Sequence, residues 1–365
     1  MDSATVTGGG NTAAGRVHTS PLRSFWQRSP TLARDLERVQ GIIHDVARDA
    51  STGIRPVLAE TVGNTGKMLR PALVVLSARA GRRVVTRRRI TGFRRRRTEA
   101  PLGFDGTPDD KIYRIAAAVE ILHMATLVHD DVIDGAETRR GAPALHTLQG
   151  NRRAILLGDF LFSSCFTLLA EDARVENARI LAAGVQHICE SQIDESLPAY
   201  AGPRSPREYY RQVAAKTALL FLLSCHVGAS ESDVAVADAQ ALRRFGYNLG
   251  MAFQVVDDLL DLTGTEEELG KPVGTDLKSR VLTLPIIYAL ESDDGDLGEM
   301  LRRGVDDNTV PRAVSLIEDR GGIARARAAA ARYTDRARRE LALLDASPAR
   351  DTLSWLLEQL LNRRR

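Results

Sequence analysis

HDDVID at residues 129–134 and VDDLLD at residues 256–261 are the two stretches that decide how this chain can fold. Both read Asp-Asp-x-x-Asp, and each lies inside a largely apolar run. Because successive helical residues turn by ~100°, the three aspartates of each stretch are expected within one arc of a helix. The apolar flanks indicate buried helices, so these aspartates should face an internal cavity rather than solvent.

The two aspartate motifs predict a paired metal site. Carboxylates held this close repel one another unless a cation lies between them. Mg²⁺ suits such oxygen-only sites, because it keeps several waters and takes further ligands from substrate phosphates. One acidic stretch on a polar helix would more simply be a solvated face, but two copies in apolar surroundings favour the metal site. The six predicted ligands are Asp130, Asp131, Asp134, Asp257, Asp258 and Asp261.

Basic side chains near these motifs suit diphosphate groups. Lys67 and Arg70 are three residues apart, so they share a helical face and could grip one diphosphate together. Two surface cations at a helix start explain that pair equally well. Arg139 and Arg140 follow the first motif and could form guanidinium forks on a diphosphate. His123 lies on nearly the same face as the first motif, although a lone histidine on a buried helix is more often a core residue.

Composition predicts a large all-α protein. Of the 365 residues, 44% are hydrophobic and only 5% aromatic, while the helix formers Ala, Leu and Arg are abundant. Apolar residues recur at helical spacing along most of the chain, and no alternating Val/Ile/Thr pattern indicates a sheet. The low, odd count of three cysteines suits the reducing cytoplasm, where we expect the protein.

Two segments stand apart from this helical pattern. Residues 1–20 are rich in small polar residues and are predicted to be a disordered leader, so that residues 21–365 form the domain. A basic loop insertion is predicted at about 82–110, where residues 82–97 hold nine arginines and no acid. Such a loop could bind anionic lipid or nucleic acid, but stacking aromatics are nearly absent, so no nucleic acid is expected. No apolar run reaches the ~18 residues that span a bilayer.

At this point the sequence resembles the trans-isoprenyl diphosphate synthases, also called the polyprenyl synthetase family. The matching stretches are GKMLRP (66–71), HMATLVHDDVIDGAETRRG (123–141), LLGDFLF (156–162), KTA (216–218) and GMAFQVVDDLLDLTGTEEELGKPVGTDL (250–277). The resemblance covers nearly everything from about Leu32 onward except the basic insertion. The resemblance implies a single isoprenoid synthase domain of about ten or more helices around a central cavity. It also implies a homodimer or, as in some long-chain members, a heteromeric partner subunit.

The resemblance further implies a Mg²⁺-dependent prenyltransferase, with about three ions when substrate is bound. Its substrates would be isopentenyl diphosphate and an allylic diphosphate, which ionises, condenses and loses a proton. The six aspartates would hold the metal ions, and Lys216, Thr217 and Gln254 would stabilise the allylic cation. The allylic diphosphate would be bound by Arg139, Lys216 and Lys271, and isopentenyl diphosphate by Lys67, Arg70, His123 and Arg140.

Product length is implied by small residues before the first motif. Ala125 and Thr126 lie about one turn before it, where bulky aromatics stop the growing chain early in this family. Their small size implies a medium- to long-chain polyprenyl product for quinone side chains. Leu122, about one turn deeper, could limit that length, so a short-chain geranylgeranyl or farnesyl product is the alternative. A lipid product could also bring the protein into transient contact with a membrane.

Two departures from the family pattern put part of the diphosphate site in doubt. Met68 stands where the family often has Arg, and Val281 replaces a Lys, so Arg280 or Lys278 would have to compensate. Three other readings stay open. A class I terpene cyclase normally carries an Asn/Ser/Glu-type second motif, a non-catalytic subunit usually loses Asp and Arg positions that are intact here, and a nucleic-acid-binding role is the least favoured.

Overall fold

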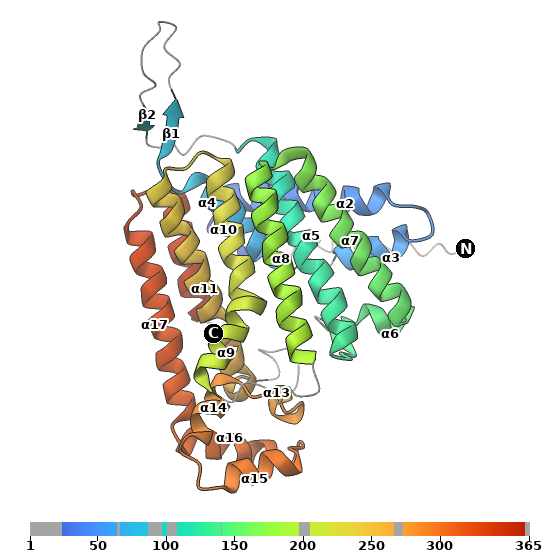
Figure 1. Cartoon of the computed structure of the whole chain (residues 1–365), viewed down its shortest axis with the longest axis vertical. Helices are drawn as coiled ribbons and strands as arrows, with labels where there is room; N and C mark the ends of the chain where they lie inside the picture. The colour runs from blue at the N-terminus through green and yellow to red at the C-terminus, as the bar shows by residue number, and fades with distance from the viewer. Residues whose placement is uncertain are drawn as a thin grey trace, which may run out of the picture.

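The computed structural model describes residues 24–63, 66–86, 97–100, 108–139, 141–196, 205–265 and 273–361. The predicted leader, the centre of the basic insertion, Arg140 and Lys271 lie outside these ranges. Within them the chain is mostly helical, which confirms the all-α prediction (Figure 1).

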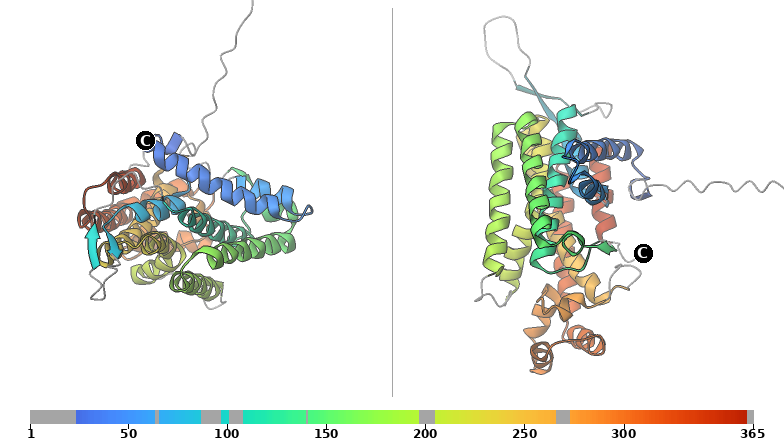
Figure 2. Two further views of the ribbon diagram at one scale, coloured as in Figure 1. Left: turned by 90° about the horizontal axis from the view of Figure 1, so that it is seen from above. Right: turned by 90° about the vertical axis from the view of Figure 1, so that its right-hand side faces the viewer.

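Long helices run alongside one another and form the body of the molecule (Figure 1). They are α5 (Asp110–Ile133), α7 (Asn151–Asp172), α8 (Val175–Ser196), α10 (Leu219–Glu231), α11 (Val236–Thr263) and α17 (Gly322–Ala342). The N-terminal helices α2 (Pro30–Asp49), α3 (Arg55–Gly63) and α4 (Leu69–Arg79) lie on the opposite side from α8 (Figure 2, right). Shorter elements complete the fold: α6 (Leu145–Gln149), α9 (Pro206–Val213), the π-helix η1 (Ala214–Ala218), α13 (Thr275–Lys278), α14 (Leu284–Leu290), α15 (Asp296–Arg303), α16 (Val310–Asp319) and α18 (Pro348–Leu361).

Several helix boundaries follow the sequence signals. Pro30 begins α2, and Ser347 caps α18, because its Oγ accepts a hydrogen bond of 3.2 Å from the Arg350 amide. The sequence did not predict α6, α13 or α15, which are short and polar. Length alone cannot separate such segments from loops.

The core depends on close approaches between helix backbones. Buried apolar residues form two clusters, and Ala218 belongs to the second of them. At Gly228 of α10, an added Cβ would lie only 2.1 Å from the Val74 carbonyl oxygen of α4. At Gly250 of α11, an added Cβ would lie 2.6 Å from the Ala218 Cα. Glycine is therefore required at both crossings, because any side chain would push the helices apart.

The basic insertion is partly ordered, which corrects the prediction of a loop without strands. β1 (Arg83–Thr86) pairs antiparallel with β2 (Arg97–Ala100), and the ribbon projects from one end of the bundle (Figure 1). Its base is tied to the body, because the Arg82 guanidinium donates to both Asp238 carboxylate oxygens at 3.1 and 2.8 Å. The Arg82 amide also donates to Asp238 at 2.8 Å. A second small ribbon pairs β3 (Thr138–Arg139) with β4 (Ala142–Pro143).

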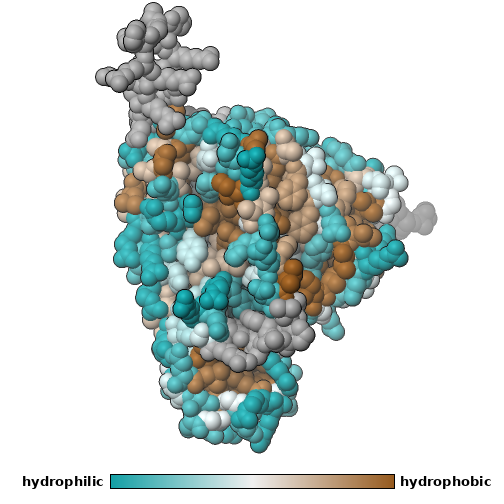
Figure 3. Space-filling view, viewed as in Figure 1, coloured by the Kyte–Doolittle hydropathy of each residue, from teal (hydrophilic) through white to brown (hydrophobic). Residues whose placement is uncertain are grey.

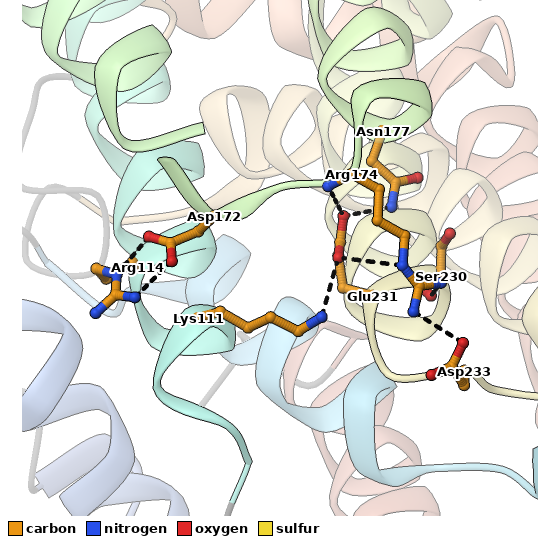
Figure 4. Close-up of polar contacts among 8 residues, drawn as sticks. All are labelled: Lys111, Arg114, Asp172, Arg174, Asn177, Ser230, Glu231 and Asp233. Atoms are coloured by element: carbon orange, nitrogen blue, oxygen red, sulfur yellow. Dashed lines mark hydrogen bonds and ion pairs between the residues drawn. The ribbon is translucent and has the colours of Figure 1, made fainter. Parts of the chain in front are cut away.

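A buried carboxylate joins three helices at that same end of the bundle (Figure 4). Glu231, at the end of α10, has a fully buried side chain. It accepts hydrogen bonds from the Arg174 amide at 2.8 Å, from Asn177 Nδ2 at 2.6 Å and from Lys111 Nζ at 3.3 Å. Asp233 pairs with the same Arg174 but is 62% exposed. Glu231 thus links α5, the start of α8 and α10 through one charge.

Three helical segments are long and apolar enough, by length and composition alone, to cross a membrane. The sequence analysis expected none, because it considered only unbroken apolar runs. They are Asp110–Ile133, Asn151–Asp172 and Pro206–Glu231, the last of which combines α9, η1 and α10. In the folded chain, 72%, 39% and 61% of their most apolar windows are buried. The low value belongs to α7, whose outer face carries exposed apolar side chains, among them Ile155, Leu156 and Phe166.

Candidate active site

A cavity of about 720 Å³ opens in the centre of the bundle, bounded by the start of α4 and by α5, α8, η1 and α11. Residues from both aspartate motifs and from the predicted diphosphate sites line it. The charged side chains predicted from the sequence and found on its wall are Lys67, Arg70, Asp130, Arg139, Lys216 and Asp257. His123, Thr126, Thr217 and Gln254 line the same cavity. Segments 66–70 and 253–257 are thereby brought to the same cavity.

The first motif divides its carboxylates between different surroundings. Asp130 lines the cavity and accepts a hydrogen bond of 2.9 Å from Gln192 of α8. Burial raises the pKa of Asp130, while the charge of Lys216 opposes that rise. Asp131 turns away to form an ion pair with Arg139, whose Nε donates to it at 2.8 Å. Asp134, at the C-terminal end of α5, is exposed. The single arc expected from helical geometry therefore spans two neighbouring environments.

The second motif is divided in the same way. Asp257 lines the cavity, but Asp258 is buried between Tyr209 and Gln254. Burial raises the pKa of Asp258 to about 7, against the opposing effect of these two hydrogen bonds. Asp261 is also buried, and it accepts a hydrogen bond of 3.0 Å from the Asp276 amide. The structure brings Asp257 to the cavity, but not Asp258 or Asp261.

A π-helical turn positions the cationic and hydroxyl groups between the two motifs. η1 interrupts the helix that runs from α9 to α10 and carries Lys216 and Thr217. The Thr217 hydroxyl donates to the Gln254 amide oxygen at 2.8 Å. π-helical turns are uncommon, cost hydrogen-bond geometry and occur often at functional sites. Nothing in the sequence pattern indicated this turn.

The segment from Lys67 to Arg70 is held in a strained backbone. Met68 adopts a left-handed conformation with φ of 49°, and its side chain is buried. Two aromatic residues hold Lys67 in place. Trp26 Nε1 donates a hydrogen bond to the Lys67 carbonyl at 3.0 Å, and Lys67 Nζ lies 4.8 Å from the centre of the Phe25 ring. The position that departs from the family pattern is therefore a core position in this chain.

Other predicted residues lie away from the cavity wall. Leu122 and Ala125 are buried in the core, so their effect on product length stays a prediction. Lys278 forms an ion pair of 2.8 Å with Asp307, and Arg280 lines a separate groove beside α15. Neither Lys278 nor Arg280 is among the described residues that line the cavity, and Val281 does not line it either.

Three polar residues at or beside the site escaped the sequence analysis. Gln192 bonds Asp130, and Tyr209 donates to Asp258. Glu195 is half-buried on α8, and burial raises its pKa against the opposing charge of the nearby Lys216. These residues belong to no short motif, and only the packing of α8 and α9 against the aspartate helices brings them together. The sequence pattern therefore contains no signal that marks these three residues as part of the site.

The carboxylates fit a metal that is shared with a diphosphate. In the described part of the chain no three His, Cys, Asp or Glu side chains converge closely enough to hold an ion by themselves. Asp130 and Asp257 reach one cavity from different helices, together with cations suited to phosphate oxygens. Mg²⁺ is commonly held by one or two carboxylates plus waters and substrate phosphates, so this donor set suits it.

Comparison with known proteins decides the family. The family model "Polyprenyl synthetase" matches residues 52–317. The chain belongs to the polyprenyl synthetase family. It is 35% identical over 293 residues to heptaprenyl diphosphate synthase component 2 of Geobacillus stearothermophilus, covering 80% of this chain and 83% of that protein. It is 33% identical over 331 residues to nonaprenyl diphosphate synthase of Mycobacterium tuberculosis, covering 89% and 91%.

Solved structures of the polyprenyl synthetase family share the fold. A polyprenyl synthase from Caulobacter crescentus, crystallised with calcium and isoprenyl diphosphate, superimposes with a TM-score of 0.78 at 32% identity. The match covers 94% of this chain and 98% of that one. The chain is thus a prenyltransferase of the polyprenyl synthetase family, with an isoprenoid synthase fold, as the sequence predicted.

Proposed function

We propose that this protein is a Mg²⁺-dependent synthase that condenses isopentenyl diphosphate with an allylic diphosphate to make a medium- or long-chain trans-polyprenyl diphosphate. The observation that carries the proposal is the joint presence of Asp130, Asp257 and Lys216 in one cavity, because the binding and ionisation of a diphosphate need both carboxylate-held metal and free cations. Relatives named heptaprenyl and nonaprenyl diphosphate synthases support the longer product.

The allylic diphosphate would lie between the two aspartate helices. Asp130 and Asp257 would hold Mg²⁺, which when bound neutralises the diphosphate as it leaves. Lys216 and Arg139 would contact the same diphosphate, and Arg139 would first have to give up part of its pairing with Asp131. Isopentenyl diphosphate would bind beside Lys67, Arg70 and His123, with its double bond toward the allylic carbon.

The reaction then needs no protein nucleophile. The allylic C–O bond breaks, and the diphosphate leaves with the electron pair. The double bond of isopentenyl diphosphate attacks the allylic carbon, and the resulting tertiary cation loses a proton to form the new double bond. Thr217 and Gln254 would face the allylic cation with their oxygen atoms and stabilise it. The released diphosphate is the proposed proton acceptor.

The active form is proposed to be a dimer, with the same chain or with a second subunit. The outer faces of α7 and α8 are unusually apolar for exposed surface, as Figure 3 shows over these helices. Their exposed apolar residues are Ile155, Leu156, Phe166, Val175, Ile180 and Ile193. Exposed apolar side chains gathered on two helices in this way favour a protein partner. The name "component 2" of one relative motivates the heteromeric alternative. The cytoplasm is the proposed location.

Product analysis tests the proposal. The purified protein is incubated with labelled isopentenyl diphosphate, Mg²⁺ and, separately, dimethylallyl, farnesyl or geranylgeranyl diphosphate, and the chains are sized by chromatography. We expect elongated trans-prenyl diphosphates beyond the geranylgeranyl length. Asp130→Asn and Asp257→Asn should abolish them, whereas Asp307→Asn, at an exposed carboxylate beside Lys278, should not. Cyclic hydrocarbons, or no product even after a search for a partner subunit, would contradict the proposal.

A further inference from the structure

We propose that Tyr209 and Asp258 are positioning residues that fix the Gln254 amide so that its carbonyl oxygen lies beside Thr217 at the wall of the active-site cavity. This inference rests on the proposed function and extends it to residues that do not line the cavity. It gives Asp258 a role that does not require it to contact metal. It gives Tyr209, which the sequence analysis did not single out, a part in catalysis through another residue.

The proposal begins with an unbroken chain of hydrogen bonds. Thr217 Oγ1 of η1 donates to Gln254 Oε1 at 2.8 Å. Gln254 Nε2, one helical turn before Asp258 on α11, donates to Asp258 Oδ1 at 2.9 Å. The other carboxylate oxygen, Asp258 Oδ2, accepts from the Tyr209 hydroxyl of α9. Each group satisfies the next, from the cavity wall to the buried interior.

The burial of Asp258 explains why its partners in the hydrogen-bond chain must be polar. Tyr209 is 3% exposed and Asp258 is 5% exposed, whereas Thr217 and Gln254 border the cavity. A carboxylate so deeply buried needs a donor on each oxygen, since an unpaired charge there would be very costly. Tyr209 supplies one donor, and the Gln254 amide nitrogen supplies the other. When it is ionised, Asp258 can therefore accept a hydrogen bond from Gln254 in only one of the two orientations of the amide.

The orientation of the amide decides what a substrate would meet. If the Gln254 amide were turned by 180°, its oxygen would face the Asp258 carboxylate oxygen, and its NH₂ group would face Thr217. Two acceptors in contact repel, so Asp258 selects the orientation with the carbonyl dipole directed at Thr217 and the cavity. The partial negative charge of that oxygen is what a developing allylic cation requires. A freely turning amide would offer NH₂ part of the time and would oppose the cation.

A double-mutant cycle tests this inference. Tyr209→Phe removes one hydroxyl from the buried end of the chain, and Gln254→Ala removes the group it is proposed to orient. For Tyr209→Phe we expect kcat to fall about tenfold, with the KM values of both substrates within about twofold, because the orientation matters for the cation rather than for diphosphate binding. The double variant should be no slower than Gln254→Ala alone. Independent, multiplicative losses would overturn the proposal, as would a wild-type kcat in Tyr209→Phe.

Tyr210→Phe is the matched control. Tyr210 is the next residue, but its hydroxyl pairs with the Tyr288 hydroxyl at 3.0 Å, and it does not line the cavity. Removing this half-buried hydroxyl should leave kcat unchanged. An equal fall in kcat for Tyr210→Phe would show that Tyr209→Phe acts through general loosening of α9, which would also overturn the proposal.

A second readout needs no activity. The hydrogen-bond chain predicts coupling in thermal unfolding of the full chain, so the loss of Tm in the Tyr209→Phe/Gln254→Ala variant should be smaller than the two single losses added together. Additive losses of Tm would show that the hydrogen bonds do not couple Tyr209 to Gln254 and would reject the positioning role. This result separates the two proposals, because the coupling can be present even if the wild-type protein makes no prenyl product.

Discussion

Replacing Glu231 by Gln should weaken the end of the bundle where α5, α8 and α10 meet. The substitution keeps the size of the side chain and one acceptor oxygen, which can still serve the Arg174 amide and Asn177. It replaces the second carboxylate oxygen with an NH₂ group that faces Lys111 Nζ, another donor, at the former distance of 3.3 Å. Figure 4 shows the contacts of Glu231 that change: the buried negative charge is lost, and two donors are left in contact.

The size of the effect follows from the burial of each partner. Lys111 and Arg174 are 27% and 41% exposed, so both cations can turn toward water after the change. The expected cost is therefore that of one or two charge-assisted hydrogen bonds, about 2–4 kcal/mol, rather than the larger cost of a stranded buried cation. Unfolding entropy of about 2.1 cal/mol/K per residue, taken over 365 residues, converts this to a Tm lower by about 3–5 °C.

The matched control is Asp233→Asn, which removes a carboxylate from the same Arg174 at an exposed site. Asp233 has φ of 54°, a conformation that Asn tolerates well, so the substitution adds no backbone strain. Its cost should stay within about 0.5 kcal/mol. Thermal unfolding of the three proteins, followed by circular dichroism at fixed protein concentration, measures the difference. Equal Tm values for Glu231→Gln and Asp233→Asn would refute the assignment of stability to the buried charge.

Three further substitutions test other parts of the structure. Gly228→Ala should cost about 1–3 kcal/mol in urea unfolding, because its Cβ would meet the Val74 carbonyl, whereas Gly41→Ala, which meets nothing within 4 Å, should gain about 0.5–1 kcal/mol. Burial raises the pKa of Asp238, but the bonds from Arg82 outweigh it and lower the pKa overall. Asp238→Asn should therefore cost stability at pH 7, and this cost should vanish as the pH falls below about 3.9 and through the depressed pKa of the folded state; an equal cost at pH 3 would contradict the pairing. Ala125→Phe should shorten the prenyl product, and an unchanged chromatographic distribution would reject its role in chain length.

The sequence predicted the helices well because their apolar spacing is long and regular. It failed for the ribbon at Arg83–Thr86 and Arg97–Ala100, since two short strands surrounded by arginines carry too little pattern and depend on pairing with each other. The docking of this ribbon on Asp238 depends on a contact 156 residues away in the chain. No local signal reports such a contact.

The candidate site was predictable in its residue types but not in their directions. On a helix buried on all sides, an arc of ~100° is wide enough to face two different neighbours. Asp257 therefore meets the cavity while Asp258 meets Tyr209, and Asp130 meets the cavity while Asp131 meets Arg139. Spacing could place each motif on a helix, but only the packed neighbours determine which carboxylate meets which partner.

The π-helical turn at Ala214–Ala218 sets which side chains of α9 and which side chains of α10 face the protein interior. A π turn contains one residue more than an α turn, so it shifts the phase of everything beyond it by ~100°. The helical phase at Leu220, after the turn, is therefore shifted relative to that at Tyr209, before it, and both side chains are buried. Deleting a single alanine from this turn would restore a regular spiral, and either the buried tyrosine or the cavity lysine would then be rotated out of place.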